Sequence, residues 1–190
     1  MTSDLINFKQ QMKKFLFYVV SFLVITTMVV LIALFASVNK NEQTSPVSSN
    51  ALVFTNPILN AEIIKNYSAT ELQWNETLKQ WEAHKAVDFS ATENTKVYAA
   101  LGGVVEAVTT NSLLGTQITI KHDGGLKTVY GMLKKEVAVN VGDFVQTGDQ
   151  IGIVETATGV EEKDGAHLHF EIWKDGSKVD PNAYLNLEGK

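Results

Sequence analysis

The sequence predicts an all-β domain, an antiparallel and sandwich-like sheet, preceded by a single transmembrane helix. Three observations lead to this prediction. A run of 24 residues without a charge lies near the N-terminus, short apolar or alternating runs follow residue 96, and turns containing glycine and aspartate separate those runs. Short strands divided by turns are typical of sandwiches and barrels, and no stretch after residue 84 has a helical period.

The uncharged run extends from Phe15 to Val38. A helix of this length spans about 36 Å at 1.5 Å per residue, which exceeds a hydrocarbon core of about 30 Å. A cleavable signal peptide is the alternative, but its apolar region usually has about 7 to 15 residues. We therefore expect an uncleaved membrane helix over residues 15–38. Three lysines precede it, so residues 1–14 are expected to form a cytoplasmic tail.

The remaining residues are expected to lie outside the membrane in three parts. Residues 39–51 are small and polar, which predicts a flexible tether that keeps the domain close to its own membrane. Residues 52–83 form a lead-in with a strand and a turn, where Trp74 and Trp81 are interpreted as packing residues rather than a ligand platform. Residues 84–190 form the all-β domain.

The composition excludes several classes of function. Asp and Glu number 21 against 16 basic residues, all of them lysine, which argues against a nucleic-acid-binding protein because such proteins need a basic face. The chain has no cysteine, so disulfides, thiolate metal ligands and a cysteine nucleophile are excluded. Any metal ion must therefore be bound by His, Asp and Glu.

Two of the four histidines lie in the segment DGAHLHFEIWKDG, residues 164–176. Its alternation of apolar and polar residues predicts a half-buried strand on which His167 and His169 share a face, with Cα atoms roughly 6.5 to 7 Å apart. Such a pair can bind a metal and transfer a proton, although two exposed histidines on a strand would give the same pattern. Glu171 shares this face and either orients a histidine or is a surface charge.

A second candidate motif is HKAVDF, in which His84 and Asp88 have the spacing H-x-x-x-D. Histidine and carboxylate donors suit Zn²⁺, and three protein ligands leave a fourth position open, as in catalytic sites. H-x-x-x-D alone occurs often by chance, but its combination with a distant H-x-H-F-E is more specific. The remaining histidine, His122 in IKHDGG, is interpreted as a turn or surface residue.

Further blocks follow these motifs in order: KVYAALGGVV, HDGGLKTVY, VNVGDFVQTGDQIG and DPNAYL. Over roughly residues 84–185 the sequence resembles the lysostaphin and LytM type of zinc peptidases, which cut peptide cross-links in bacterial cell walls. The resemblance implies a groove floored by an antiparallel sheet and peptidoglycan peptides as substrate. It also implies zinc ligands at His84, Asp88 and His169, with His167 as the general base.

The sequence departs from this family pattern in several places: Ala86 stands for the usual glycine of H-x-G-V-D, WNETLKQWEAH replaces the expected lead before the first ligand, and two other departures lie closer to the site. The block T-x-Y-x-H-L reads TVYGML, so Met132 stands where the family usually has another active-site histidine. Methionine cannot donate a hydrogen bond, and its neighbour Tyr130 is a candidate substitute. The short approach to H-L-H is replaced by GVEEKDGA, whose three acidic residues are expected to add negative charge beside the groove.

These departures, with the predicted anchor and tether, resemble the membrane-bound sporulation subgroup, stage II sporulation protein Q. The resemblance implies a partner protein anchored in the mother-cell membrane, across the intermembrane space. Two functions therefore stay open. One is a membrane-anchored, extracytoplasmic zinc endopeptidase acting on peptidoglycan, and the other is a weakly active or inactive scaffold in the forespore membrane that docks such a partner.

Overall fold

The computed structural model describes residues 12–14, 16, 19–28, 30 and 52–185. The chain divides into two compact units, Met1–Asn50 and Ala51–Lys190, and the described residues of the first are helical. None of the helices in the described part is both long and apolar enough to cross a membrane. The helix expected over residues 15–38 includes residues outside the described part, and the expected tether lies outside it entirely. Both stay predictions.

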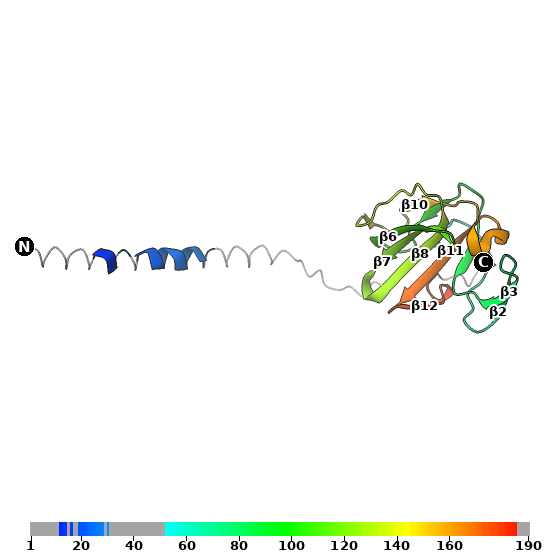
Figure 1. Cartoon of the computed structure of the whole chain (residues 1–190), viewed down its shortest axis with the longest axis horizontal. Coiled ribbons are helices and arrows are strands. Elements are labelled where there is room, and N and C mark those ends of the chain that lie inside the picture. The colour runs from blue at the N-terminus through cyan, green and yellow to red at the C-terminus, as the bar shows by residue number, and fades with distance from the viewer. Residues whose placement is uncertain (1–11, 15, 17–18, 29, 31–51, 186–190) are drawn as a thin grey trace, which may run out of the picture. The chain divides into compact units, whose positions relative to one another are not determined.

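The second unit is built on one large antiparallel sheet (Figure 1). Its strands, in spatial order, are β1 (Ile63–Lys65), β4 (Val87–Ser90), β11 (His167–Lys174), β8 (Leu126–Leu133), β7 (Gly115–Lys121), β6 (Gly103–Asn111) and β9 (Phe144–Val145). A further strand, β12 (Ser177–Val179), pairs with the C-terminal part of β11. The prediction of a mostly antiparallel β domain after residue 84 is confirmed.

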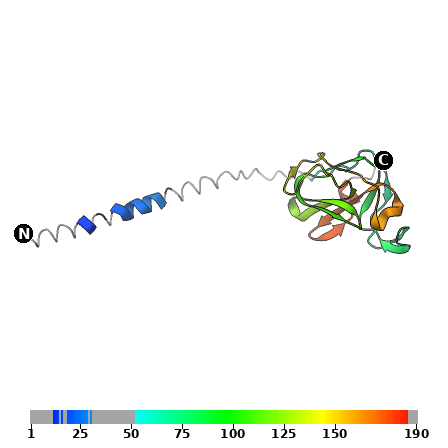
Figure 2. The same ribbon diagram turned by 45° about the horizontal axis from the view of Figure 1, so that its top comes forward.

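The hydrophobic core joins the large sheet to a second sheet of two strands, β5 (Lys96–Tyr98) and β10 (Gln150–Ile153). Leu168, Phe170 and Ile172 of β11 are fully buried in this core, together with Val97 of β5 and Ile151 of β10. Figure 2 shows these elements as one compact body. Because alternate residues of a strand point to opposite faces, the polar residues of β11 lie on the other face.

The lead-in residues contribute to both this sheet and a separate hairpin. Strand β1 pairs with β4 at the edge of the large sheet, whereas β2 (Leu72–Asn75) and β3 (Gln80–Ala83) pair with each other. Trp74 and Trp81 are opposite one another in the hairpin, with ring centroids 5.7 Å apart. They pack edge to face, yet 43% and 63% of their surfaces remain exposed, so they are not core residues.

Turns and short helices complete the domain. Asp143 accepts a hydrogen bond from the Asn140 N–H at 2.8 Å, and Asp149 accepts one from the Gln146 N–H at 2.8 Å. Each aspartate stabilises a tight turn, as the repeated Gly-Asp pattern predicts. The short helical segments are η2 (Asp123–Gly125), η3 (Gly159–Asp164) and α2 (Asn182–Leu185).

Candidate metal centre

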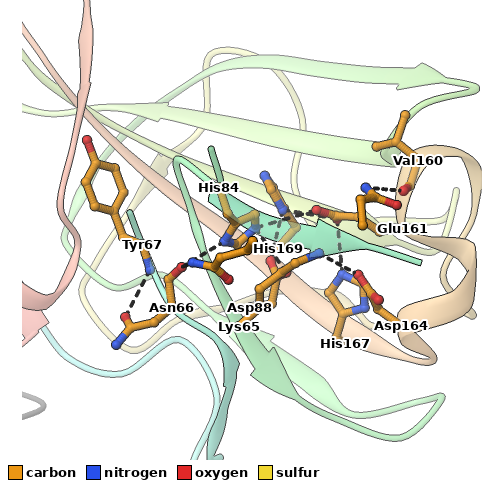
Figure 3. Close-up of polar contacts among 12 residues, drawn as sticks. Lys65, Asn66, Tyr67, His84, Asp88, Val160, Glu161, Asp164, His167 and His169 are labelled. Atoms are coloured by element: carbon orange, nitrogen blue, oxygen red, sulfur yellow. Dashed lines mark hydrogen bonds and ion pairs between the residues drawn. The ribbon is translucent and has the colours of Figure 1, made fainter. Parts of the chain in front are cut away.

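The pairing of β4 with β11 brings the two histidine motifs together. In the antiparallel register Asp88 lies opposite His169, although 81 residues separate them in the sequence. His84 precedes β4 and is carried to the same place (Figure 3). On the other side of β11, Gly131 is opposite His169. The sheet therefore assembles the three predicted ligands at one point.

The three side chains face one another closely and are buried. His84 Nε2 lies 3.1 Å from Asp88 Oδ2, and His169 Nδ1 lies 3.0 Å from Asp88 Oδ1. None of the three is more than 5% exposed. Within the described part of the chain, His84 Nε2 and Asp88 Oδ2 are buried and, although 3.1 Å apart, form no well-aligned hydrogen bond with each other or with another group. Two unpaired polar atoms that face the same point are costly in a protein interior unless an ion or ligand binds them.

Both candidate histidine ligands use their second ring nitrogen as a hydrogen-bond donor. His84 Nδ1 lies 3.1 Å from the carbonyl oxygen of Asn66, and His169 Nε2 lies 3.1 Å from Glu171 Oε1. Since these oxygens only accept, each imidazole carries its proton on the outer nitrogen when neutral. The inner nitrogens, His84 Nε2 and His169 Nδ1, then offer lone pairs to a metal, as in known histidine–metal sites.

Glu171 is buried and does not act as a surface charge. Its Oε1 accepts hydrogen bonds from His169 and from Lys178 Nζ at 2.6 Å, and its Oε2 accepts one from Trp173 Nε1 at 2.6 Å. Only 4% of the residue is exposed. This arrangement matches the orienting role among the two alternatives that the sequence left open.

Glu161 is the residue that the sequence analysis missed. It lies on η3, in the acidic insert, and its donor atom falls within 4.8 Å of those of His84, Asp88 and His169. The carboxylate is 4% exposed, whereas the insert was expected to place its charges beside the groove. The sequence offered one weak signal, an acidic pair between two glycines directly before His-x-His. Nothing in the spacing indicated which acid turns inward.

His167 lies next to this group of four without belonging to it. It is completely buried, its Nδ1 donates to the Gly165 carbonyl oxygen at 2.8 Å, and its Nε2 lies 3.2 Å from Glu161 Oε2. The outer nitrogen is again occupied by a carbonyl, so Nε2 faces the centre. The two histidines of H-L-H therefore differ: both contact Glu161, but His169 also contacts Asp88.

The carboxylates control the pKa values of the imidazoles. Burial alone would lower the pKa of His84, but the nearby carboxylates of Asp88 and Glu161 raise it to about 9. The pKa of His169 is likewise raised well above its ordinary value, and that of His167 is raised. Burial opposes ionisation of Asp88 and Glu161 as well, yet the histidines lower the pKa of both carboxyls. Without a metal, the centre therefore holds protons that a cation would displace.

Met132 and Tyr130 have no place in this group. Met132 is 1% exposed, has a positive φ of 61°, and lines a separate pocket of about 350 Å³ with Thr158 and Glu155. Tyr130 is a core residue whose hydroxyl accepts a hydrogen bond from the Ala100 N–H at 2.8 Å, and burial raises its pKa to about 12. The suggestion that Tyr130 replaces a missing histidine is wrong, because its side chain points into the core.

His122 was expected to be a turn or surface residue: it directly precedes η2, as the first alternative predicts, but it is not on the surface. It is 6% exposed, its Nδ1 lies 2.8 Å from the Gly102 carbonyl oxygen, and its Nε2 lies 2.8 Å from Thr128 Oγ1. Both ring nitrogens are thus satisfied by neutral groups. Burial is the main reason that its pKa is lowered. His122 is not part of the metal group.

The donor set fits a metal ion. Two imidazole nitrogens and carboxylate oxygens, buried and held in place by their second hydrogen bonds, are the ligands that Zn²⁺ and similar ions take in proteins that lack cysteine ligands. The orphaned atoms of His84 and Asp88 supply the independent sign that a cation is expected there.

Several known proteins are similar to this chain. Stage II sporulation protein Q of Bacillus subtilis is 36% identical over 91 residues, which cover 47% of this chain and 31% of that protein. Peptidoglycan DD-endopeptidase ShyC of Vibrio cholerae is 33% identical over 102 residues, 54% of this chain and 23% of the relative. The chain thus spans less than a third of either curated relative.

Among solved structures, the SpoIIQ–SpoIIIAH pore-forming complex contains a chain that matches with a TM-score of 0.61 and 27% identity. The match covers 70% of this chain and 91% of the other. Residues 82–181 match the family described as Peptidase family M23, and they contain all four residues of the metal group. The resemblance seen in the sequence is confirmed, and this chain belongs to peptidase family M23.

Proposed function

We propose that this protein is a zinc-dependent endopeptidase that cleaves the peptide cross-links of peptidoglycan. The observation that carries the proposal is the convergence of His84, Asp88 and His169, with two of their donor atoms buried and unpaired. Membership of family M23 and the similarity to a peptidoglycan DD-endopeptidase support this substrate class.

Each residue of the centre has a role in this proposal. His84 Nε2, an Asp88 oxygen and His169 Nδ1 hold the ion, and Glu171 orients His169 through its Nε2–H. When bound, zinc supplies Lewis-acid chemistry, which lowers the pKa of water and polarises a peptide carbonyl. His167 Nε2 takes a proton and returns it to the leaving amine, because its Nδ1 is fixed by the Gly165 carbonyl.

The test is release of new amino termini from purified peptidoglycan by the full chain loaded with zinc. We expect release that stops after treatment with a chelator and in His167→Ala, which removes the proposed base but none of the proposed ligands. Release at the same level in wild type, His167→Ala and chelated protein would contradict the peptidase proposal.

A second function, a scaffold with little hydrolysis, is favoured by one observation. Met132 is buried and apolar at the position where the resemblance leads us to expect an active-site histidine. The matched SpoIIQ structure is a complex with SpoIIIAH. In this alternative, the protein would likewise bind a membrane-anchored partner protein. The peptidoglycan assay separates the two: a zinc-loaded peptidase releases amino termini, and a scaffold keeps its metal but releases none.

The proposal includes a location outside the cytoplasmic membrane, anchored by residues 15–38 with the N-terminus inside. The uncharged run and the three preceding lysines support it. Because the chain has no cysteine, single replacements report topology directly. In intact cells, a membrane-impermeant maleimide should label Ser177→Cys, an exposed position of the outer domain, and should not label Ser3→Cys. The reverse pattern would contradict this orientation.

A further inference from the structure

A six-residue segment covers the metal group. This segment is η3, Gly159–Asp164, which we call the strap, and it lies directly before β11. Of its three acidic residues, only Glu161 is buried, whereas Glu162 is exposed and Asp164 pairs with Lys65. The strap is therefore not a uniformly charged surface loop, because one carboxylate is directed into the protein (Figure 3).

The buried carboxylate contacts every inner imidazole nitrogen of the centre. Glu161 Oε2 lies 3.2 Å from both His167 Nε2 and His169 Nδ1, and its Oε1 lies 3.5 Å from His84 Nε2. It occupies the space to which the histidines point. A second, independent sign of a ligand here is the unpaired His84 Nε2, which Glu161 approaches without forming a hydrogen bond.

Distant segments hold the strap in this position. The lead-in contributes three contacts: Lys65 Nζ to Asp164 Oδ2 at 2.9 Å, Asn75 Nδ2 to the Val160 carbonyl oxygen at 3.0 Å, and Thr77 Oγ1, which accepts from the Lys163 N–H at 2.9 Å. These residues come from β1 and the β2–β3 hairpin, before the first candidate ligand in the sequence.

The other end of the strap is tied to the turn between β6 and β7. The Val160 N–H donates to the Leu113 carbonyl oxygen at 3.1 Å. Gly159 has a φ of +61°, and a Cβ there would lie 2.2 Å from the Ser112 carbonyl oxygen, so only glycine fits. Contacts from the lead-in and from the β6–β7 turn thus hold the strap, and with it Glu161, in position.

We propose that Glu161 is a fourth protein ligand of the metal and that the strap closes the site in the resting protein. The inference rests on the proposed metal site and deepens it. A catalytic zinc site keeps one coordination position for water or substrate, whereas four protein donors make a closed site. His167, the proposed base, is completely buried beneath the same segment. Cleavage therefore requires that the strap lift and that the contacts of Lys65, Asn75 and Thr77 release it.

The test uses Co²⁺ in the full chain, because its visible absorption reports the ligands around the ion. Acetohydroxamate, a small metal-binding anion, serves as the probe. We expect wild type to take up about one Co²⁺ per chain and to show no spectral change with the probe. Glu161→Ala should bind Co²⁺ more weakly and change its spectrum in a saturable way, because the probe enters the vacated position.

Two further variants sharpen this experiment. Glu162→Ala, an exposed acid on the same strap, should behave as wild type, whereas Asp164→Asn, which loses the charge paired with Lys65, should admit the probe partially. Glu161→Gln preserves size and guards against misfolding, and we expect its Co²⁺ affinity to fall by on the order of tenfold or more.

The outcomes separate the two proposals. Equal probe binding by wild type and Glu161→Ala would overturn the closed site while leaving the peptidase proposal intact. Absence of Co²⁺ and Zn²⁺ uptake by wild type would overturn both. Faster peptidoglycan cleavage by Glu161→Ala than by wild type would support the strap as the closing element.

Discussion

The buried histidines of this protein lie in two different chemical environments. His122 and His84 are about equally buried, at 6% and 5% exposure, and both lie beside the same sheet. The partners of His122 are a carbonyl and a hydroxyl oxygen, and its pKa is lowered. The partners of His84 include two carboxylates, and its pKa is raised to about 9.

The difference teaches that burial does not mark a functional histidine, whereas the charge and number of its partners do. Both nitrogens of His122 are satisfied, so the ring only supports its neighbours. His84 keeps a buried nitrogen without a hydrogen bond, surrounded by acids, and such an environment is stable only with a cation or a proton in place.

Replacement of single histidines should have the largest effect on metal binding. His169→Ala should lower the metal affinity by at least about 100-fold, beyond the 10- to 100-fold typical of groups that merely orient a ligand. Metal content measured after gel filtration without chelator checks this. His122→Ala is the matched control: it should lose stability but retain about one metal ion per folded chain. Loss of metal in both variants would show that the two environments are not distinct.

The orienting carboxylate should have the next largest effect. Glu171→Gln keeps the shape of the side chain but weakens the acceptor for the His169 Nε2–H, so metal affinity should fall by about 10- to 100-fold. Competition with a coloured zinc chelator measures it. An unchanged metal affinity would show that Glu171 does not orient His169 and only pairs with Lys178.

The pH dependence should have opposite signs in metal-free and metal-loaded protein. Since the pKa of His84 is raised from 6.5 to about 9, its proton stabilises the metal-free fold fully below pH 6.5, and this contribution is lost as the pH rises through 9. We expect a loss on the order of 2 kcal/mol. Zinc binding strengthens over the same range because fewer protons compete with it.

Urea unfolding at pH 6.5 and pH 9, with chelator and with zinc, measures both slopes. His84→Gln is the control in which the decline of the metal-free protein should shrink. A metal-free protein equally stable at both values would contradict the assignment of a raised pKa to this histidine.

The smallest effect is expected for a substitution beside His122, the histidine outside the metal group. Thr128→Val removes the hydroxyl that satisfies His122 Nε2 and should cost about 1 to 2 kcal/mol, because a buried polar atom is left unpaired. Metal affinity should stay within about twofold of wild type, since Thr128 contacts none of the metal group. A large loss of metal would mean that His122 is coupled to the centre through β8.

The antiparallel β domain and the two motifs that meet in it could be predicted from the amino-acid sequence. Alternation along residues 167–174 sets the polar and apolar faces of β11, and this local period survives folding because it follows from strand geometry. Asp143 and Asp149 form turns for an equally local reason. The convergence of His84, Asp88 and His169 came from family resemblance, and the pairing of β4 with β11 explains it.

The roles of Glu161, His122 and Tyr130 depend on contacts that form when the chain folds. Their partners lie on other strands and loops: Glu161 is turned inward by contacts from the lead-in and the β6–β7 turn, His122 meets Gly102, and Tyr130 meets Ala100. The local sequence does not predict which distant backbone atom will form a hydrogen bond with a given side chain. An acid in a charged insert and a histidine before a turn therefore look solvated until the surrounding segments enclose them.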